Sequence, residues 1–243
     1  MDWFKKWFGS PFYKILYENR DEYEAQEFIE HLLTYLQPRP GSRMLDIACG
    51  EGRFARQLAE HGYDVTGIDI SMESIDAAKV YESGNLHFYH QDMRMPFYIN
   101  YFDFAFNFFT SFGYFAHDRD HALAAKSFAA SLKPDGILVI DYLNAERVIA
   151  NLVPEETVER GDYTFRITRQ VERKHIVKNI FVTDNGEEKQ FRESVAAFSP
   201  ADFIGMFRQG GMSLVGTFGD YKLGAYHPLD SPRLIMVFKK KYA

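Results

Sequence analysis

Hydrophobic residues follow two different patterns along this chain. Between residues 43 and 142, short apolar runs alternate with segments of helical spacing. The strands expected there are 44–48, 63–70, 86–90, 102–109 and 137–142. The fourth is apolar on both sides, as expected in the centre of a parallel sheet. Strands that alternate with helices favour βαβ units, so this part of the chain predicts an α/β fold with a Rossmann-like, doubly wound and mostly parallel sheet.

The second pattern begins near residue 155, where apolar and polar residues alternate with a period of two in 163–171, 176–182 and 190–195. An Asn185-Gly186 pair separates the last two segments, and such a pair is typical of a two-residue hairpin turn. We therefore interpret residues 151–198 as an inserted small antiparallel β-sheet of three or four strands. It could cover the mouth of a site, bind a substrate, or pair with a second subunit.

The N-terminal residues form a third region. Residues 11–36 have helical spacing, and Pro38 ends the helix because proline cannot continue it. Tyrosines are dense in this segment, which suits either simple packing or a lid over a bound ligand. The first ten residues are aromatic and basic, and we expect them to dock on the chain's own domain or a second subunit rather than on a membrane. The expected parts are therefore a lid region (1–37), a core (38–150 and 199–243) and the insert (151–198).

Composition narrows the class of protein. The chain has 243 residues, of which 46% are hydrophobic, enough for one large α/β domain with a subdomain. A net charge of −6 gives no electrostatic footprint for nucleic acid. The single cysteine, Cys49, excludes an internal disulfide and a cysteine-rich zinc site. No apolar run approaches the roughly 18 residues of a membrane span and no signal peptide is apparent, so we expect a cytoplasmic protein without nucleic-acid or membrane partners.

The candidate chemistry centres on residues 43–54, Arg-Met-Leu-Asp-Ile-Ala-Cys-Gly-Glu-Gly-Arg-Phe. A strand, a turn with Gly50 and Gly52, and a helix form the first half of a nucleotide-binding unit. With Ala55 as its last small residue, the pattern also fits a dinucleotide fingerprint. Asp46, just before the turn, would repel a pyrophosphate and attract a cationic or amino-bearing ligand such as S-adenosylmethionine. A purely structural turn with a solvated Asp46 is the third interpretation.

Further candidates follow the next strand ends. Asp69 lies about twenty residues past the glycine turn and can accept hydrogen bonds from both ribose hydroxyls of an adenosine. NAD enzymes use an acid in the same way, so Asp69 indicates a nucleoside without choosing between the two ligands. Asp92 follows the third strand and can accept an adenine amino group, with Met93 against the ring, or can merely cap a loop. The aromatic end of the fourth strand would wall a dry pocket. His117 and His121 follow it as the nearest candidate bases.

Together, these spaced elements resemble the motifs of class I S-adenosylmethionine-dependent methyltransferases. The matching segments are 45–52, 67–71, 91–93, 102–103 and 132–136. The resemblance implies a seven-stranded sheet whose last strand is antiparallel. A narrower likeness, to small-molecule N-methyltransferases that act on amino sugars, rests on Tyr17–Arg20 with Tyr23, on 109–114 and on the hairpin insert. It implies that Tyr17 and Arg20 close over the methyl donor.

We therefore predict transfer of a methyl group from S-adenosylmethionine to a small-molecule acceptor, as N- or O-methylation. An NAD(P)-dependent oxidoreductase and a non-catalytic donor-binding scaffold are the alternatives, and a homodimer is considered. The predicted donor site comprises Tyr17, Arg20, Asp46, Ala48, Gly50, Gly52, Asp69, Ile70, Met72, Asp92, Met93 and Phe108. Phe109 and Tyr114 are expected at the acceptor. The candidate catalytic residues are His117, His121 and Tyr17, and no metal is expected.

Overall fold

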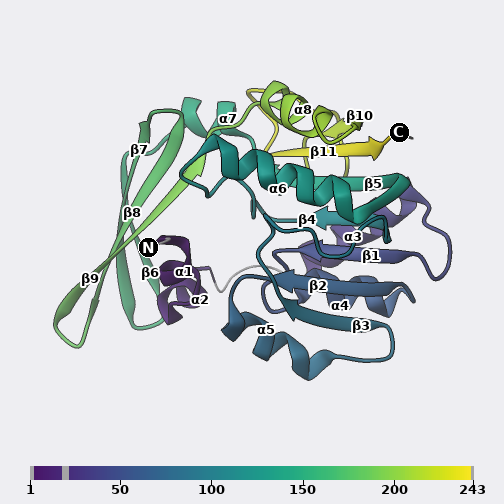
Figure 1. Cartoon of the computed structure of the whole chain (residues 1–243). Helices are drawn as coiled ribbons and strands as arrows, with labels where there is room; N and C mark the ends of the chain where they lie inside the picture. Colours follow the sequence, from purple (N-terminus) through teal and green to yellow (C-terminus); the bar gives the residue numbers. More distant parts are fainter. Residues whose placement is uncertain (1–2, 18–21, 242–243) are drawn as a thin grey trace.

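Two β-sheets form the framework of the protein in the computed structural model, which describes residues 3–17 and 22–241 (Figure 1). All neighbouring strands of the larger sheet, sheet A, are parallel except at β11, which is antiparallel to both of its neighbours. The expected fold class, a doubly wound seven-stranded sheet with an inserted antiparallel sheet, is confirmed. In spatial order, sheet A consists of β10 (Met212–Phe218), β11 (Arg233–Lys240), β5 (Leu132–Leu143), β4 (Phe102–Asn107), β1 (Arg43–Ile47), β2 (Asp64–Asp69) and β3 (Leu86–His90).

Helices cover both faces of sheet A, so its strands are buried on two sides. In β5, Leu138 and Ile140 belong to the core with the helices of one face, and Val139 to the core with the helices of the other. This alternation explains why the strands are nearly continuous apolar runs. One face carries α3 (Glu22–Leu36), α4 (Arg53–Glu60) and α5 (Met72–Ala78), and the other carries α6 (Asp118–Ser131) and α8 (Pro200–Arg208). Two short helices, η1 (Lys79–Tyr81) and α7 (Ala145–Ala150), complete this part.

The order of strands reverses between β1 and β4, because the chain proceeds from β1 through β2 to β3 and then returns to β4 on the other side of β1. At such a reversal the following helices go to opposite faces, which leaves a crevice at the carboxyl ends of the strands. Because β11 runs antiparallel to its neighbours, it begins at this same edge. The edge is therefore where a ligand site is expected.

The inserted sheet, sheet B, consists of β6 (Glu155–Arg160), β7 (Tyr163–Glu172), β8 (His175–Asp184) and β9 (Glu187–Ala196), all antiparallel. Asn185 and Gly186 both have positive φ, 51° and 82°, which fits the type I′ turn expected at this pair. One face of the sheet is apolar and carries Phe165, Ile167, Ile180 and Val182. The division of the chain into three parts at residues 37, 150 and 198 stays a prediction.

The apolar face of sheet B is covered by two short N-terminal helices, α1 (Trp3–Phe8) and α2 (Pro11–Leu16). Trp7 is only 1% exposed and packs with Phe12 and Leu16 against Phe165 and its neighbours on sheet B. The expected single helix over residues 11–36 is therefore wrong: α2 ends at Leu16 and α3 begins at Glu22. Of the first ten residues, the described part from residue 3 onward docks on the chain itself, as expected. We call α1, α2 and sheet B together the cap; it lies beside sheet A in Figure 1.

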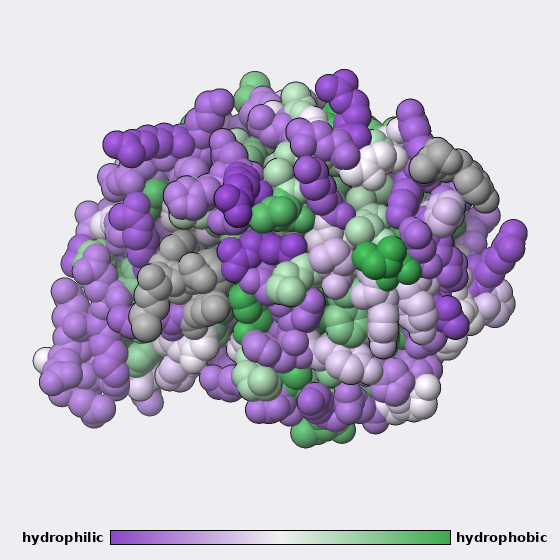
Figure 2. Space-filling model, in the orientation of Figure 1, coloured by the Kyte–Doolittle hydropathy of each residue, from purple (hydrophilic) through white to green (hydrophobic). Residues whose placement is uncertain are grey.

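The surface of the molecule is mixed in character. On the face shown in Figure 2, hydrophobic residues are scattered among hydrophilic ones. Across the described residues, no helix has the length and apolar character needed to span a membrane.

The shared core of the cap generates a prediction. Replacing Phe165, fully buried beneath α1 and α2, with Ala should destabilise the cap by about 3–5 kcal/mol. Hydrogen exchange should then accelerate in α1, α2 and sheet B while β4 and β5 stay protected. Val171→Ala, at a half-exposed position of the same strand, is the control. Equal acceleration in β4 and β5 would show that the cap has no core of its own.

Candidate active site

A cavity of about 760 Å³ lies at the carboxyl edge of sheet A, under the cap. This size is ordinary for a small-molecule or cofactor site. Its walls come from the glycine turn after β1, the ends of β2, β3 and β4, helices α1 and α2, and strand β9. Ten of the predicted donor-site residues and both predicted acceptor residues line it, namely Tyr17, Asp46, Ala48, Gly50, Asp69, Ile70, Met72, Asp92, Met93 and Phe108, with Phe109 and Tyr114.

The two glycines of the turn have different tasks. Gly50 lines the cavity, has a φ of 57°, and donates its backbone N–H to Asp69 Oδ2 at 2.9 Å. Gly52 is not among the described residues that line the cavity. Its φ is 81°, and an added Cβ would lie 2.4 Å from the ring of Phe88. Gly52 is therefore required for close packing of the turn against β3, whereas only Gly50 presents backbone to a ligand.

Asp46 is the buried charge of the site. Its side chain is 1% exposed, and Oδ2 has no hydrogen-bond partner among the described residues. Burial, with some repulsion from Asp69, raises the pKa of this carboxyl to about 7. The backbone of Ala55 and the charge of Arg53 oppose this rise only in part, so a positively charged group in the cavity would stabilise the ionised form further.

Asp69 is held in place by the backbone. Its two oxygens accept the N–H groups of Gly50 and Ser71, at 2.9 and 2.8 Å. Burial nevertheless raises its pKa above the ordinary value. It lies at the end of β2, where Ile70 and Met72 continue the cavity wall.

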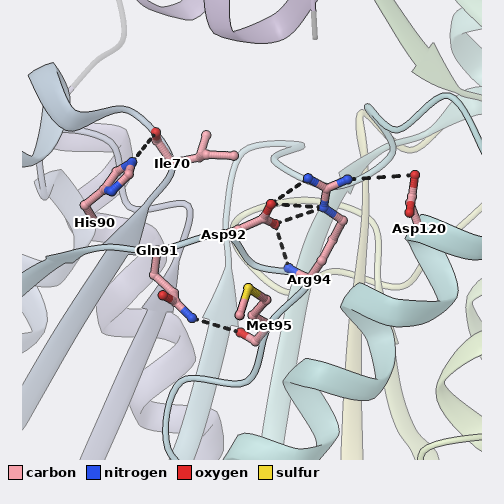
Figure 3. A network of polar contacts seen from close by, with 7 residues as sticks. All are labelled: Ile70, His90, Gln91, Asp92, Arg94, Met95 and Asp120. Carbon is pink, nitrogen blue, oxygen red and sulfur yellow. Dashed lines mark hydrogen bonds and ion pairs between the residues drawn. The ribbon is translucent and has the colours of Figure 1, made fainter. Parts of the chain in front are cut away.

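Asp92 lies at the end of β3 and forms a bidentate ion pair with Arg94, the shortest contact being 2.6 Å (Figure 3). Arg94 reaches in turn toward Asp120 at 3.8 Å. This network fixes the orientation of the Asp92 carboxylate beside Met93 on the cavity wall. The ribose and adenine roles of Asp69 and Asp92 remain predictions, and the structure brings both acids to one cavity.

The two candidate bases lie elsewhere. Neither His117 nor His121 is among the described residues that line the cavity. His121 is 2% exposed, and its Nε2 accepts the backbone N–H of Phe115 at 3.3 Å. Burial lowers its pKa to about 4, so this imidazole is neutral at physiological pH. The geometry favours a structural role for His121 among the rings of Phe112 and Phe198.

The cap supplies the wall opposite the glycine turn. Tyr17 donates its O–H to Glu193 Oε1 at 2.8 Å, and Trp7 Nε1 donates to the same oxygen at 2.6 Å. Lys178 pairs with Glu193 at 3.2 Å. Burial and the Glu193 carboxylate raise the pKa of Tyr17 well above its usual value, so the phenol keeps its proton. Arg20 lies outside the described residues.

Five charged residues of the cavity wall were missed by sequence reasoning, namely Lys14, Glu51, Arg53, Glu73 and Glu193. Glu193 lies on β9. The alternation of apolar and polar residues predicts a strand there, but it does not show whether a polar residue faces solvent or a cavity. Arg53 directly follows Gly52 at the start of α4, a position that could have been read as ligand-facing. Lys14 lies on the cap and pairs with Glu51 of the glycine turn at 2.6 Å, so it joins the cap to the core.

Comparison with known proteins identifies the class. The model of a family described as "Methyltransferase domain" matches residues 17–205, most of the chain. A Bacillus subtilis (strain 168) protein named as a methyltransferase, YqeM, is 38% identical over 126 residues, which cover 49% of this chain and 49% of YqeM. The matched part thus spans about half of that relative's length. The chain belongs to the methyltransferase-domain family, and the family expected from the sequence is confirmed.

Solved structures agree in fold. The CcbJ methyltransferase of Streptomyces caelestis superimposes with a TM-score of 0.79 at 17% identity, covering 97% of this chain and 98% of CcbJ. The sugar N-methyltransferase KedS8 of Streptoalloteichus sp. ATCC 53650 gives 0.71 at 20% identity, covering 95% of this chain and 93% of KedS8. At such identities the likeness establishes the fold.

The packing of the glycine turn can be tested without a ligand. Gly52→Ala should lower the free energy of unfolding by about 2 kcal/mol or more, because it adds overpacking against Phe88 to the cost of positive φ. Gly50→Ala, with the same sign of φ but open space around it, should cost only about 1 kcal/mol. Gly84→Ala, in open space without positive φ, should be near neutral in the same urea titration. Equal losses at Gly50 and Gly52 would contradict the assigned contact.

The buried carboxyl predicts a pH dependence of stability. Because the pKa of Asp46 is about 7 in the folded protein and near 4 in the unfolded chain, the folded protein retains a proton that the unfolded chain releases. Wild-type stability relative to Asp46→Asn should therefore fall as pH rises from about 4 to about 7, by on the order of 3 kcal/mol. Urea titrations of both proteins at pH 5, 6, 7 and 8 measure this. A constant difference would show that Asp46 is ionised throughout.

Proposed function

We propose that this protein is an S-adenosylmethionine-dependent methyltransferase that methylates a small molecule at nitrogen or oxygen. The observation that carries the proposal is the Asp46 carboxylate, buried on the cavity wall with an oxygen unpaired among the described residues. Such a group suits a ligand that carries ammonium and sulfonium charge. A dinucleotide would instead bring a pyrophosphate anion to the same turn, which Asp46 and Asp69 would repel.

The walls formed by the ends of β1, β2 and β3 suit the donor. Asp46 and the backbone of Gly50 would hold its methionine end, and Asp69 would accept its ribose hydroxyls. Asp92 would accept the adenine amino group, with Met93 against the ring. Arg53, at the start of α4, adds a cation beside this end of the cavity, where the donor has its carboxylate.

The walls formed by the end of β4 and by the cap suit the acceptor. Phe8, Tyr13 and Tyr114 stand edge to face, with ring centroids 4.9–5.2 Å apart, and Glu193 adds a carboxylate on this side. Aromatic rings with one carboxylate are the surroundings in which amines bind. The fold shared with the sugar N-methyltransferase KedS8 supports a small acceptor of this kind. We therefore favour an amine over a hydroxyl as the nucleophile.

Catalysis by these residues is mainly positioning. When bound, the donor supplies a methyl group on a sulfonium that needs no further activation. The protein's own task is to align an acceptor with that group and to exclude water. Helices α1 and α2, which line the cavity, would exclude the water. An amine must lose one proton in the course of methylation, and Glu193 offers a carboxylate to receive it. The cytoplasmic location and the homodimer expected from the sequence remain predictions.

Calorimetric titration with S-adenosylhomocysteine tests the donor site. We expect micromolar binding to the wild type and a loss of at least about tenfold in Asp69→Ala, which removes a charged hydrogen-bond acceptor. Asp64→Ala, at the start of the same strand, should bind like the wild type. Binding of NADH without binding of S-adenosylhomocysteine would replace this proposal by the dinucleotide alternative. Turnover against panels of amines and phenols then identifies the acceptor class.

A further inference from the structure

Two consecutive residues at the cavity wall adopt a backbone conformation that side chains other than glycine rarely occupy. Phe109 has a φ of 55° and Thr110 a φ of 60°, directly after the end of β4. Both line the cavity. A left-handed conformation at non-glycine residues persists only where surrounding contacts enforce it, and it clusters at functional sites. The question is which residues enforce it.

Asp141 binds both residues of this turn. Its carboxylate Oδ2 accepts the backbone N–H of Phe109 at 2.9 Å. Its backbone carbonyl accepts the N–H of Thr110, also at 2.9 Å. One residue of β5 therefore fixes two successive peptide groups of the chain that follows β4.

Arg233 completes the contact from a third strand. Its Nε donates to Asp141 Oδ1 at 2.7 Å, and Nη2 donates to Thr110 Oγ1 at 2.9 Å. Its guanidinium also lies 5.6 Å from the centre of the Phe109 ring. Arg233 can reach the turn because β11 is antiparallel, so the first residue of that strand lies at the carboxyl edge of sheet A. Tyr221 adds a hydrogen bond to Asp141 Oδ2 at 3.1 Å.

This pair is largely shielded from water, with side-chain exposures of 0% for Asp141 and 18% for Arg233. Asp141 is fully buried, and neither Asp141 nor Arg233 is among the described residues that line the cavity. A buried ion pair is poor at stabilising a fold, because apolar residues of similar volume often do as well or better. What the pair provides, and apolar residues could not, is the set of directed hydrogen bonds to the turn.

We propose that Asp141 and Arg233 are positioning residues that hold residues 109–110 in the left-handed turn and thereby set the wall past which the methyl group is transferred. What the wall does rests on the proposed function. The contact itself rests on the geometry alone. The contact with the turn and the role of the wall in methyl transfer can therefore fail separately, and the experiment has one readout for the contact and one for the role.

The test uses the full chain with Asp141→Asn, in which one acceptor oxygen becomes an amide donor and cannot serve both Arg233 and the turn. Asp103→Asn is the control, because Asp103 pairs with Lys133 at 2.7 Å between β4 and β5, at the opposite edge of the sheet from the turn. The first readout needs no ligand. Hydrogen exchange in residues 108–112 should become at least about fivefold faster in Asp141→Asn and stay unchanged in Asp103→Asn. Unchanged exchange in Asp141→Asn overturns the proposal.

The second readout compares two donor analogues by calorimetry. S-adenosylhomocysteine lacks the transferred group, whereas sinefungin carries an amine where the methyl sulfonium would be. Asp141→Asn should weaken sinefungin about tenfold and S-adenosylhomocysteine by less than about threefold. Equal weakening of both overturns the assignment to the methyl-transfer wall. Faster exchange in a protein whose wild type binds neither analogue supports the contact and overturns the proposed function.

A suppressor keeps the test decisive. Glycine adopts positive φ without strain, so Thr110→Gly added to Asp141→Asn should restore at least half of the lost preference for sinefungin. Failure to restore it overturns a positioning role. If Asp141→Asn does not fold, Tyr221→Phe removes one hydrogen bond from Asp141 Oδ2 without leaving a buried charge unpaired. It should shift both readouts in the same direction by a smaller amount, and no shift overturns the proposal.

Discussion

The rest of the structure depends on one constraint: negatively charged side chains are buried near the point where the strand order of sheet A reverses. Asp46 lies near the end of β1, which borders the crevice, and Asp69 ends the neighbouring strand β2; both carboxyl groups are largely withheld from water. Carboxylates in such surroundings need hydrogen-bond donors or a cation beside them. Gly50 of the glycine turn and Ser71 after β2 donate to Asp69, while one oxygen of Asp46 finds no donor among the described residues. The fold thus forms a site that a positively charged ligand completes.

A second buried carboxylate at the same edge has the opposite use. Asp141 accepts hydrogen bonds from Phe109, Tyr221 and Arg233, so its charge is satisfied within the protein. Asp46 faces the cavity, whereas Asp141 lies behind its wall. The difference follows from topology: an antiparallel strand brings a cation, Arg233, to the carboxyl edge beside β5, and no strand does so beside β1. One carboxylate is left for a ligand, and the other fixes the shape of the wall.

The parts of this structure that sequence predicts are those encoded by neighbouring residues. The glycine turn, the acids at strand ends and the Asn185-Gly186 hairpin are local signals, and each lies where it was expected. The end of α2 at Leu16 was missed because helical spacing continues past it in the sequence, although α2 packs on sheet B and α3 on sheet A. Contacts between Trp7 and Glu193, or Asp141 and Arg233, join residues 186 and 92 positions apart. Periodicity shows that a face is apolar or polar, but not which partner covers it.

The walls that we propose for the donor and for the acceptor come from different parts of the chain. The walls assigned to the donor come from sheet A and its turns, whereas Tyr17 and Glu193 come from a body with its own core around Phe165 and Trp7. Among the described residues, the polar contacts that join the two include Lys14 with Glu51 and the hydroxyl of Tyr142 with the carbonyl of Ala196. A substitution at Glu193 can therefore change the acceptor surface without removing a residue from the core of sheet A, to which Val195 of the same strand belongs. Glu193 also accepts hydrogen bonds from Trp7 and Tyr17. The residue that would recognise an acceptor therefore also holds the N-terminal helices in place over the cavity.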